Sequence, residues 1–127
     1  MNWDQFENFK EAEFRCKCCG RAAMDGTFVG RLQQLRTATG IPLIISSGFR
    51  CPDHNDRVSS TGRNGPHTTG HAADISVSRG DAFKILRYAM SFGFTGIGVQ
   101  QKGDGRYLHL DDLPASPGVL RPTIWSY

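Results

Sequence analysis

The sequence has no long hydrophobic run, and nowhere does it stay apolar over the ~20 residues that a membrane-spanning helix requires. Residues 1–7 have neither the basic start nor the apolar middle of a secretory signal. Lys and Arg are scattered and the formal net charge is only +3, so neither a membrane nor a nucleic acid is an expected partner. These absences predict a chain made in the cytoplasm without a signal peptide.

The sequence also has no internal repeat and no linker-like segment. A length of 127 residues, of which 39% are hydrophobic and 21% charged, is typical of one globular domain with a modest core. We therefore expect a monomer with one domain that spans residues 1–127.

Apolar residues recur at helical spacing in two segments. The first helix is expected to begin after a cap at Asp25, to run to about Thr39 and to end at Gly40. The second is expected to begin at a cap by Asp81 and to end at Gly93. The buried face expected for this second helix comprises Ala82, Phe83, Ile85, Leu86, Ala89 and Met90.

Four short segments have the composition of strands. Residues 42–46 contain a short apolar run, which favours a central strand, and residues 96–100 and 107–111 flank a glycine-rich hairpin turn. The remaining strand follows Asp74. Residues 51–66 are rich in turn-forming residues and predict a long loop that can contain one short helical turn, of the kind that often forms the rim of a site. The predicted fold class is α+β, with a small antiparallel sheet and two main helices.

Cysteine is scarce, and three of the four cysteines, Cys16, Cys18 and Cys19, lie together, with Cys51 apart from them. Adjacent cysteines do not readily bind one ion together in a tetrahedron, and disulfides are not expected in a reducing cytoplasm. We interpret the four as small, buried hydrophobic side chains. A secondary metal site and a bridge to Cys51 formed after release from the cell remain the alternatives.

The segment between His67 and Asp74 combines an imidazole and a carboxylate seven residues apart. Gly70 and two alanines separate them, and these small residues permit a tight turn that brings the two side chains to one point. After Asp74, an apolar, β-branched alternation predicts a strand. An alternative, in which His67 and His71 bind a metal from one helix face, is disfavoured because two threonines and Gly70 separate them and no glutamate follows His67.

A third candidate ligand lies downstream, on the segment that carries His109 and Asp111. These two residues share one face of the predicted strand, because polar and apolar residues alternate there. That strand is expected to pair beside the one that carries Asp74. Two imidazoles and one carboxylate, from His67, Asp74 and His109, leave an open fourth position, which is the pattern of a catalytic zinc site.

The residues of this predicted site resemble the zinc site of the D-Ala-D-Ala carboxypeptidase family of metallopeptidases, which includes wall endopeptidases of phages and bacteria. The resemblance covers nearly the whole chain in the expected order, although the family usually has serine at the position of Gly65. The segments that carry it are His67-x-x-Gly70-x-Ala72-x-Asp74, His109-x-Asp111, Ser47-Gly48-Phe49-Arg50, Phe14–Cys18 and Trp125–Tyr127.

The resemblance implies a fold shared with hedgehog signalling domains, and one Zn²⁺ ion held by His67, Asp74 and His109. It also implies a functional role for Arg50, whose guanidinium would stabilise a developing oxyanion or bind a substrate carboxylate. Ser47 is expected to lie beside the substrate with Arg50. The implied reaction is hydrolysis of a peptide bond.

Peptide hydrolysis also needs a base. Many members of the family carry an acidic base three residues before the last histidine ligand, and in this chain that position is Arg106. Asp104, from the same hairpin, is the candidate that we favour. Asp111 is a second candidate, unless it orients a metal ligand instead, and His71 is a third.

The sequence therefore predicts a zinc metallopeptidase that acts on the stem peptides of bacterial peptidoglycan. We expect a D,D-carboxypeptidase, a D,D-dipeptidase or an L-Ala–D-Glu endopeptidase, in a phage or prophage lysin that reaches the wall by lysis or as a virion component. The alternative, which Arg106 keeps open, is a zinc-containing binding module without catalysis, or a virion structural protein of the same fold.

Overall fold

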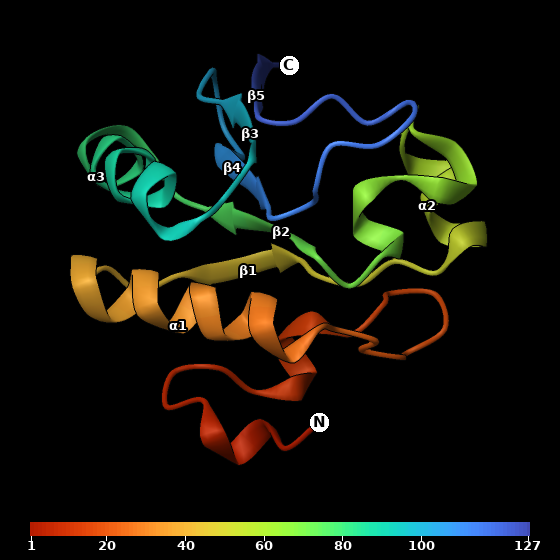
Figure 1. The fold of residues 1–127 in the computed structure, drawn as a ribbon, viewed down its shortest axis with the longest axis horizontal. Helices are drawn as coiled ribbons and strands as arrows, with labels where there is room; N and C mark the ends of the chain where they lie inside the picture. The colour runs from red at the N-terminus through yellow and green to blue at the C-terminus, as the bar shows by residue number, and fades with distance from the viewer.

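The computed structural model, which describes residues 1–127, contains five strands: β1 (Ile44–Ser47), β2 (Ala72–Ser76), β3 (Gly96–Gln100), β4 (Tyr107–Asp111) and β5 (Thr123–Ser126). They form one sheet in the order β1-β2-β4-β3-β5. The first four strands of this order pair antiparallel, and β5 pairs parallel to β3. The C-terminal strand therefore forms one edge of the sheet (Figure 1).

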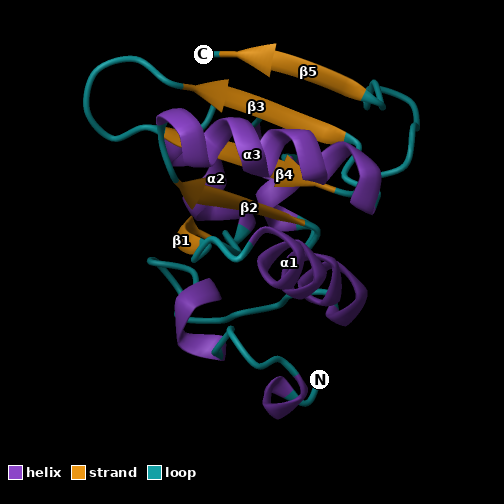
Figure 2. Cartoon of the chain, turned by 90° about the vertical axis from the view of Figure 1, so that its left-hand side faces the viewer, coloured by secondary structure: helices purple, strands orange, loops and turns teal.

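Three α-helices pack around the sheet: α1 (Gly26–Thr39), α2 (Pro52–Val58) and α3 (Arg79–Ala89). Figure 2 shows α3 in front of the strands and α2 behind them. Both caps predicted for α1 are confirmed. The Asp25 side chain accepts a hydrogen bond from Phe28 N at 2.9 Å, and Gly40 ends the helix with φ +69°.

The two central strands, β2 and β4, have two different faces. On one face, Ile75, Leu108 and Leu110 are buried in an apolar core together with residues of α1 and α3. On the opposite face lie Asp74 and His109, which are direct partners across the two strands, as predicted. The core thus supports one side of the sheet and leaves polar side chains to form a site on the other.

The predicted α+β fold is confirmed, with corrections to its elements. The sheet is mixed rather than antiparallel, because residues 123–126 form a fifth strand. β1 is an edge strand and not a central one, and Ile44 is 61% exposed. An apolar run of this length suits either place in a sheet, and only its partners decide. The loop predicted at residues 51–66 contains α2 and short 3₁₀ turns.

The buried face of α3 is narrower than predicted. Phe83 is 72% exposed on α3, and Met90, which follows the last residue of α3, is 59% exposed. α3 begins at Arg79, two residues before the predicted cap. Gly93 ends this segment with φ +88°, as predicted. The residues buried on this helix are Ala82, Ile85 and Ala89, and Leu86 packs against the core.

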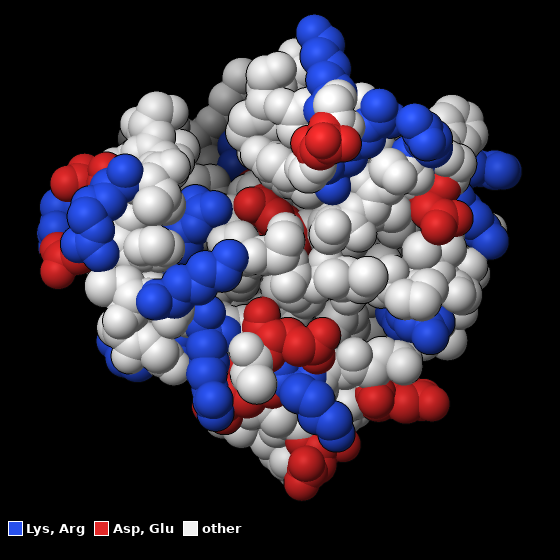
Figure 3. Space-filling model, turned by 180° about the vertical axis from the view of Figure 1, so that it is seen from behind, with Lys and Arg blue, Asp and Glu red and all other residues white.

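None of the helices is both long enough and apolar enough to cross a membrane. Figure 3 shows acidic and basic side chains interspersed over the rear of the molecule, without a continuous field of one sign. This face therefore offers no broad basic surface of the kind that binds nucleic acid.

Candidate metal centre

His67 is positioned by the turn that Gly70 closes. It lies in a short 3₁₀ turn, Pro66–Thr68. Gly70 has φ +80°, and its carbonyl oxygen accepts a hydrogen bond from Asp25 N at 3.0 Å. A Cβ at position 70 would collide with the carbonyl oxygen of Ala23, so a side chain does not fit. The tight turn predicted from the sequence is present, and it packs against the start of α1.

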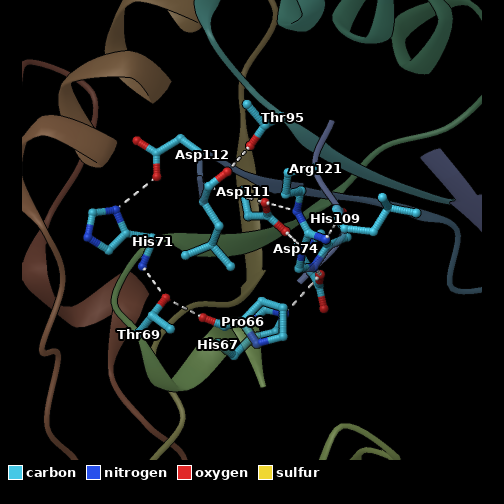
Figure 4. A network of polar contacts seen from close by, with 12 residues as sticks. Pro66, His67, Thr69, His71, Asp74, Thr95, His109, Asp111, Asp112 and Arg121 are labelled. Carbon is cyan, nitrogen blue, oxygen red and sulfur yellow. Dashed lines mark hydrogen bonds and ion pairs between the residues drawn. The ribbon is translucent and has the colours of Figure 1, made fainter. Parts of the chain in front are cut away.

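Three side chains from three segments converge on one point (Figure 4). Asp74 Oδ1 lies 3.2 Å from His67 Nε2 and 3.2 Å from His109 Nδ1. One ligand atom from each residue lies within 4.8 Å of the others, and all three residues are buried. These are the residues that the sequence predicts as metal ligands, and we call them the metal triad.

Hydrogen bonds on the outer nitrogens orient both imidazoles toward the centre of the metal triad. His67 Nδ1 donates to the Gly48 carbonyl oxygen at 2.8 Å, which leaves the Nε2 lone pair directed toward Asp74. His109 Nε2 donates to the Asp111 carboxylate at 2.7 Å, which leaves its Nδ1 lone pair directed toward Asp74 as well. Three acceptor atoms that face one another need a cation or a proton between them. The donor set therefore fits a zinc ion.

A buried ion pair supports His109 from behind. Arg121 Nε and Nη2 donate to the two carboxylate oxygens of Asp111 at 2.9 and 2.7 Å, a bidentate contact that holds the carboxylate in place. Burial raises the pKa of Asp111, but His109 and Arg121 outweigh burial and lower the pKa to about 2. Asp111 is therefore ionised at neutral pH, and both of its oxygens are engaged in orienting neighbours.

The charges around the metal triad favour an ionised carboxylate. Burial raises the pKa of Asp74, but the imidazoles of His109 and His67, which donate hydrogen bonds to Asp74 when they carry a proton on the facing nitrogen, outweigh burial and hold the pKa well below its usual range. Burial lowers the pKa of His109, but Asp111 and Asp74 outweigh it and raise that pKa above its ordinary value. An ionised carboxylate is the form that binds a cation.

The alternating glycines of β3 make room for these groups. A Cβ at Gly96 would overlap the Asp111 carboxylate, and one at Gly98 would lie 2.6 Å from Trp125 Nε1. Gly98 is also the strand partner of His109. The two glycines thus leave space for the side chains that lie on the site face of the sheet.

Arg50 reaches the metal triad from the segment that follows β1. Its Nη2 lies 3.6 Å from Asp74 Oδ2, and its backbone N donates to the His67 carbonyl oxygen at 3.0 Å. Its Nε donates to Ser47 Oγ at 3.1 Å, and its Nη1 donates to Asn55 Oδ1 at 3.0 Å. The guanidinium is therefore held in one orientation with an edge toward Asp74.

A groove of about 480 Å³ runs past the metal triad. His67, Asp74 and His109 all line it, together with Arg50. The other residues that line it are Val58, Ser59, Ser60, Thr61, Pro66, Tyr107, Trp125 and Tyr127. The candidate ligands therefore adjoin a space that a substrate can enter.

The sequence profile of one protein family, described as peptidase M15, matches residues 7–111, which include the metal triad and Arg50. The chain belongs to the peptidase M15 family. The resemblance to D-Ala-D-Ala carboxypeptidase-type enzymes is thus confirmed, and M15 peptidases are zinc-dependent. No curated protein matches the chain in sequence.

Some side chains around this M15 site were not predicted as part of it, among them Tyr107, Tyr127 and Arg121. The alternation that places His109 and Asp111 on one face also places Tyr107 there, and that signal is sufficient to find it. The approach of Tyr127 and Arg121 has no local signal, because it depends on where the last segment of the chain returns to the sheet.

Four predicted residues do not line the groove: Asp104, Ser47 and His71, and also Asp111, which lies behind His109. Asp104 is exposed in the turn between β3 and β4 and lines a different hollow, because the extended strand carries the chain ~3.3 Å per residue away from that turn. Ser47 holds Arg50 through its hydroxyl group but does not line the groove. The ring of His71 pairs with Asp112, with its Nδ1 2.9 Å from the carboxylate (Figure 4).

The cysteines are not four buried hydrophobic residues, because residues 16–20 form a surface turn. Cys16 is buried, but Cys18 and Cys19 are exposed and Cys51 is partly exposed. Cys16 and Cys19 form a Cys-x-x-Cys pair that the sequence interpretation overlooked. Burial raises the pKa of Cys16, but backbone N–H groups of Cys19, Cys51 and Cys18 outweigh it and lower the pKa to about 7.

Replacing Asp111 with asparagine is expected to lower zinc affinity about 10- to 100-fold, because partners that orient a histidine ligand contribute that much. The amide keeps the shape of the carboxylate but removes the charge that raises the pKa of His109. Calorimetric titration of the metal-free protein with zinc measures the change. Asp112→Asn is the matched control, since this neighbour pairs with His71 and Arg31. Equal losses in both variants would contradict the role of Asp111.

Proposed function

We propose that this M15 protein is a zinc-dependent peptidase that hydrolyses peptide bonds in the stem peptides of bacterial peptidoglycan. One observation carries the proposal: three metal-binding atoms converge beside a groove that also presents the guanidinium of Arg50. Family membership supports a metallopeptidase, and the peptidoglycan substrate follows from the family resemblance. The expected type is a D,D-carboxypeptidase or an L-Ala–D-Glu endopeptidase, in a phage or prophage lysin.

The residues of the metal triad would hold Zn²⁺ through His67 Nε2, an Asp74 carboxylate oxygen and His109 Nδ1. Zinc bound there supplies a Lewis acid that polarises the scissile carbonyl group and lowers the pKa of a coordinated water. The protein fixes the tautomers of the two histidine ligands. The Gly48 carbonyl oxygen accepts from His67 Nδ1 and the Asp111 carboxylate accepts from His109 Nε2, which leaves His67 Nε2 and His109 Nδ1 free to bind the metal.

Two kinds of hydrogen-bond donor face the groove. Arg50 keeps one guanidinium edge beside Asp74, while Ser47 and Asn55 hold its other N–H groups. It is thereby placed to donate to an oxyanion or to a substrate carboxylate. Burial raises the pKa of Tyr107, so its phenol stays protonated at neutral pH and acts as a donor in the groove rather than as a base.

The groove adjoins a second hollow of about 640 Å³, and the two share Thr61, Pro66 and Trp125 in their linings. Leu113 and Val119 add apolar surface to the second hollow. A free amino acid does not need a site of this length, whereas a stem peptide extends beyond the bond that is cut. The shared lining supports a peptide as the substrate.

A second candidate function, a zinc-bearing binding module without catalysis, is favoured by one specific observation. Asp74 is the only acidic residue that lines the groove, and it belongs to the metal triad, so no separate carboxylate is in place as a general base. Arg106, at the family's usual acidic position, donates to the Gly103 carbonyl oxygen at 2.8 Å and does not line the groove. The module would bind zinc but show no turnover.

Mass spectrometry of purified peptidoglycan incubated with the zinc-loaded protein tests the proposal. New fragments that are absent when a chelator has removed the metal would establish hydrolysis. Their masses identify the bond, because loss of one D-Ala indicates a carboxypeptidase and release of whole stem peptides indicates an endopeptidase. Zinc bound at the metal triad, that is, zinc which is lost in His67→Ala, without new fragments would instead favour the binding module.

Replacing Arg50 with lysine is expected to lower kcat about 10²- to 10³-fold, as the loss of one preorganised oxyanion donor does. Lysine keeps the charge but not the planar fork that Ser47 and Asn55 hold. Steady-state kinetics on the peptide substrate measure the effect, and a rise in KM alone would indicate a clamp for a substrate carboxylate. Arg87→Lys, on α3, is the control. An unchanged kcat and KM in Arg50→Lys would show that the Arg50 guanidinium contributes neither to catalysis nor to substrate binding.

A further inference from the structure

A second cluster of metal-binding side chains lies outside the groove. The sulfur atoms of Cys16, Cys19 and Cys51 all lie within 4.8 Å of one another, and all of these cysteines are free thiols. From this convergence we propose a second, structural zinc site, held by these three thiolates, that ties the N-terminal segment to the start of α2.

The Cys-x-x-Cys turn directs both of its thiols to one position. Gly20 N donates to the Cys16 carbonyl oxygen at 2.9 Å, and Gly20 has φ +76°, which closes the turn directly after Cys19. The backbone N–H group of Cys51 donates to the Cys16 sulfur at 3.3 Å, and the backbone around Cys16 lowers the pKa of its thiol. Hydrogen bonds to sulfur stabilise the thiolate, which is the form that binds a metal.

Cys51 reaches this turn because two chain segments run side by side. Phe49 N donates to the Phe14 carbonyl oxygen at 3.0 Å, and a Cβ at Gly48 would lie 2.6 Å from Phe14 Cα. Glycine at position 48 therefore permits the close approach that places Cys51 beside Cys16, 35 residues earlier in the chain.

Three thiolates that meet at one point favour a soft metal over a disulfide. A disulfide joins two sulfur atoms and leaves the third thiol without a partner, whereas one zinc ion takes all three in tetrahedral coordination. Three thiolates on a divalent ion leave one negative charge, and Arg57 is close by, with its Nη2 donating to Cys18 Sγ at 3.1 Å. Because Cys18 has this partner of its own, the fourth position of the zinc is assigned to solvent.

The proposed zinc would stabilise the part of the fold that positions Arg50. Cys51 follows Arg50 directly and is the N-cap residue of α2. α2 carries Asn55, whose Oδ1 accepts from Arg50 and whose Nδ2 donates to Thr61 Oγ1, on the rim of the groove, at 2.8 Å. A metal at the N-terminal end of α2 restrains this arrangement without entering the groove, so its role is structural.

Metal titration of the full chain tests the site. The protein is reduced with a non-thiol reductant, stripped of metal and titrated with Co²⁺, whose thiolate complexes absorb strongly in the near ultraviolet. We expect a thiolate band that saturates at about one equivalent, persists in His67→Ala and in Cys18→Ser, and is lost in Cys19→Ser. Cys19 is exposed, so its replacement leaves the core intact, and Cys18→Ser is its matched control.

A second measurement needs no variant. Zinc is expected to protect Cys16, Cys19 and Cys51, but not Cys18, from alkylation by iodoacetamide, as read by mass spectrometry of the peptides. A missing thiolate band in the wild-type protein, a band that survives Cys19→Ser, or equal alkylation with and without zinc would overturn the proposal. Because the thiolate band is read in His67→Ala, failure of this site is distinguishable from failure of the metal triad.

Discussion

Replacing His67 with alanine is expected to abolish zinc-dependent hydrolysis and to remove the metal from the groove. The variant lacks one of three candidate ligands, and the Gly48 carbonyl oxygen loses its donor. A metal Lewis acid contributes several kcal/mol to such a reaction, so the rate is expected to fall about 10³-fold or more. Peptidoglycan hydrolysis and zinc content, measured on the same preparation, report the effect.

His71→Ala is the matched control for this variant. His71 is an imidazole four residues further along the chain, but it is partly exposed and pairs with Asp112 instead of joining the metal triad. A metal bound from one helix face by both histidines predicts equal losses in the two variants, whereas the metal triad predicts a loss only at His67. Zinc in the groove and full activity in His67→Ala would show that the metal triad is not the catalytic site.

Replacing Arg121 with methionine is expected to lower the free energy of unfolding by about 3–5 kcal/mol, since one partner of a buried ion pair is removed. The Arg121 side chain is 9% exposed and that of Asp111 is fully buried. The carboxylate would therefore lose two N–H donors in a place that water does not reach. Methionine is flexible and fills much of the vacated space. Urea denaturation of the metal-free protein measures the loss.

Arg63→Met is the control for this loss, because Arg63 pairs with Asp53 on the surface, where both side chains are more than half exposed, and exposed pairs contribute little. An equally small loss in Arg121→Met would contradict the role of the buried pair.

The pKa of Asp111 is about 2 in the folded protein, against ~4 in an unfolded chain. The stability that the pair contributes is present above the unfolded value, so the deficit should shrink as pH falls from about 4 toward 2.

The parts of the site that depend on neighbours in the chain could be predicted from the sequence. The turn between His67 and Asp74 is encoded by Gly70, whose positive φ strains any residue with a Cβ. The face that His109 shares with Asp111 is encoded by strand alternation. Both signals act over a single turn or strand. That these side chains bind zinc in the protein stays a prediction for the experiments above.

Asp104, the candidate base predicted from the sequence, shows that residues close in sequence can lie far apart in the fold. Asp104 is five residues from His109, but an extended strand separates positions along its length rather than gathering them. The groups that do line the groove include Tyr107, from the same strand face as His109, and Tyr127, from the far end of the chain. The groove therefore presents phenol groups where the sequence predicts a carboxylate as the base.

Local sequence alone specifies α1 with its two caps and the alternating strands, and it predicts which residues form the candidate metal site, because capping, glycine turns and strand periodicity each act within a few residues. Only the folded chain decides that β1 lies at an edge, that Arg121 pairs with Asp111, and that Cys51 meets Cys16 and Cys19. These contacts depend on how whole segments pack against one another. Packing free energy is shared among many side chains, so no short pattern in the sequence encodes it.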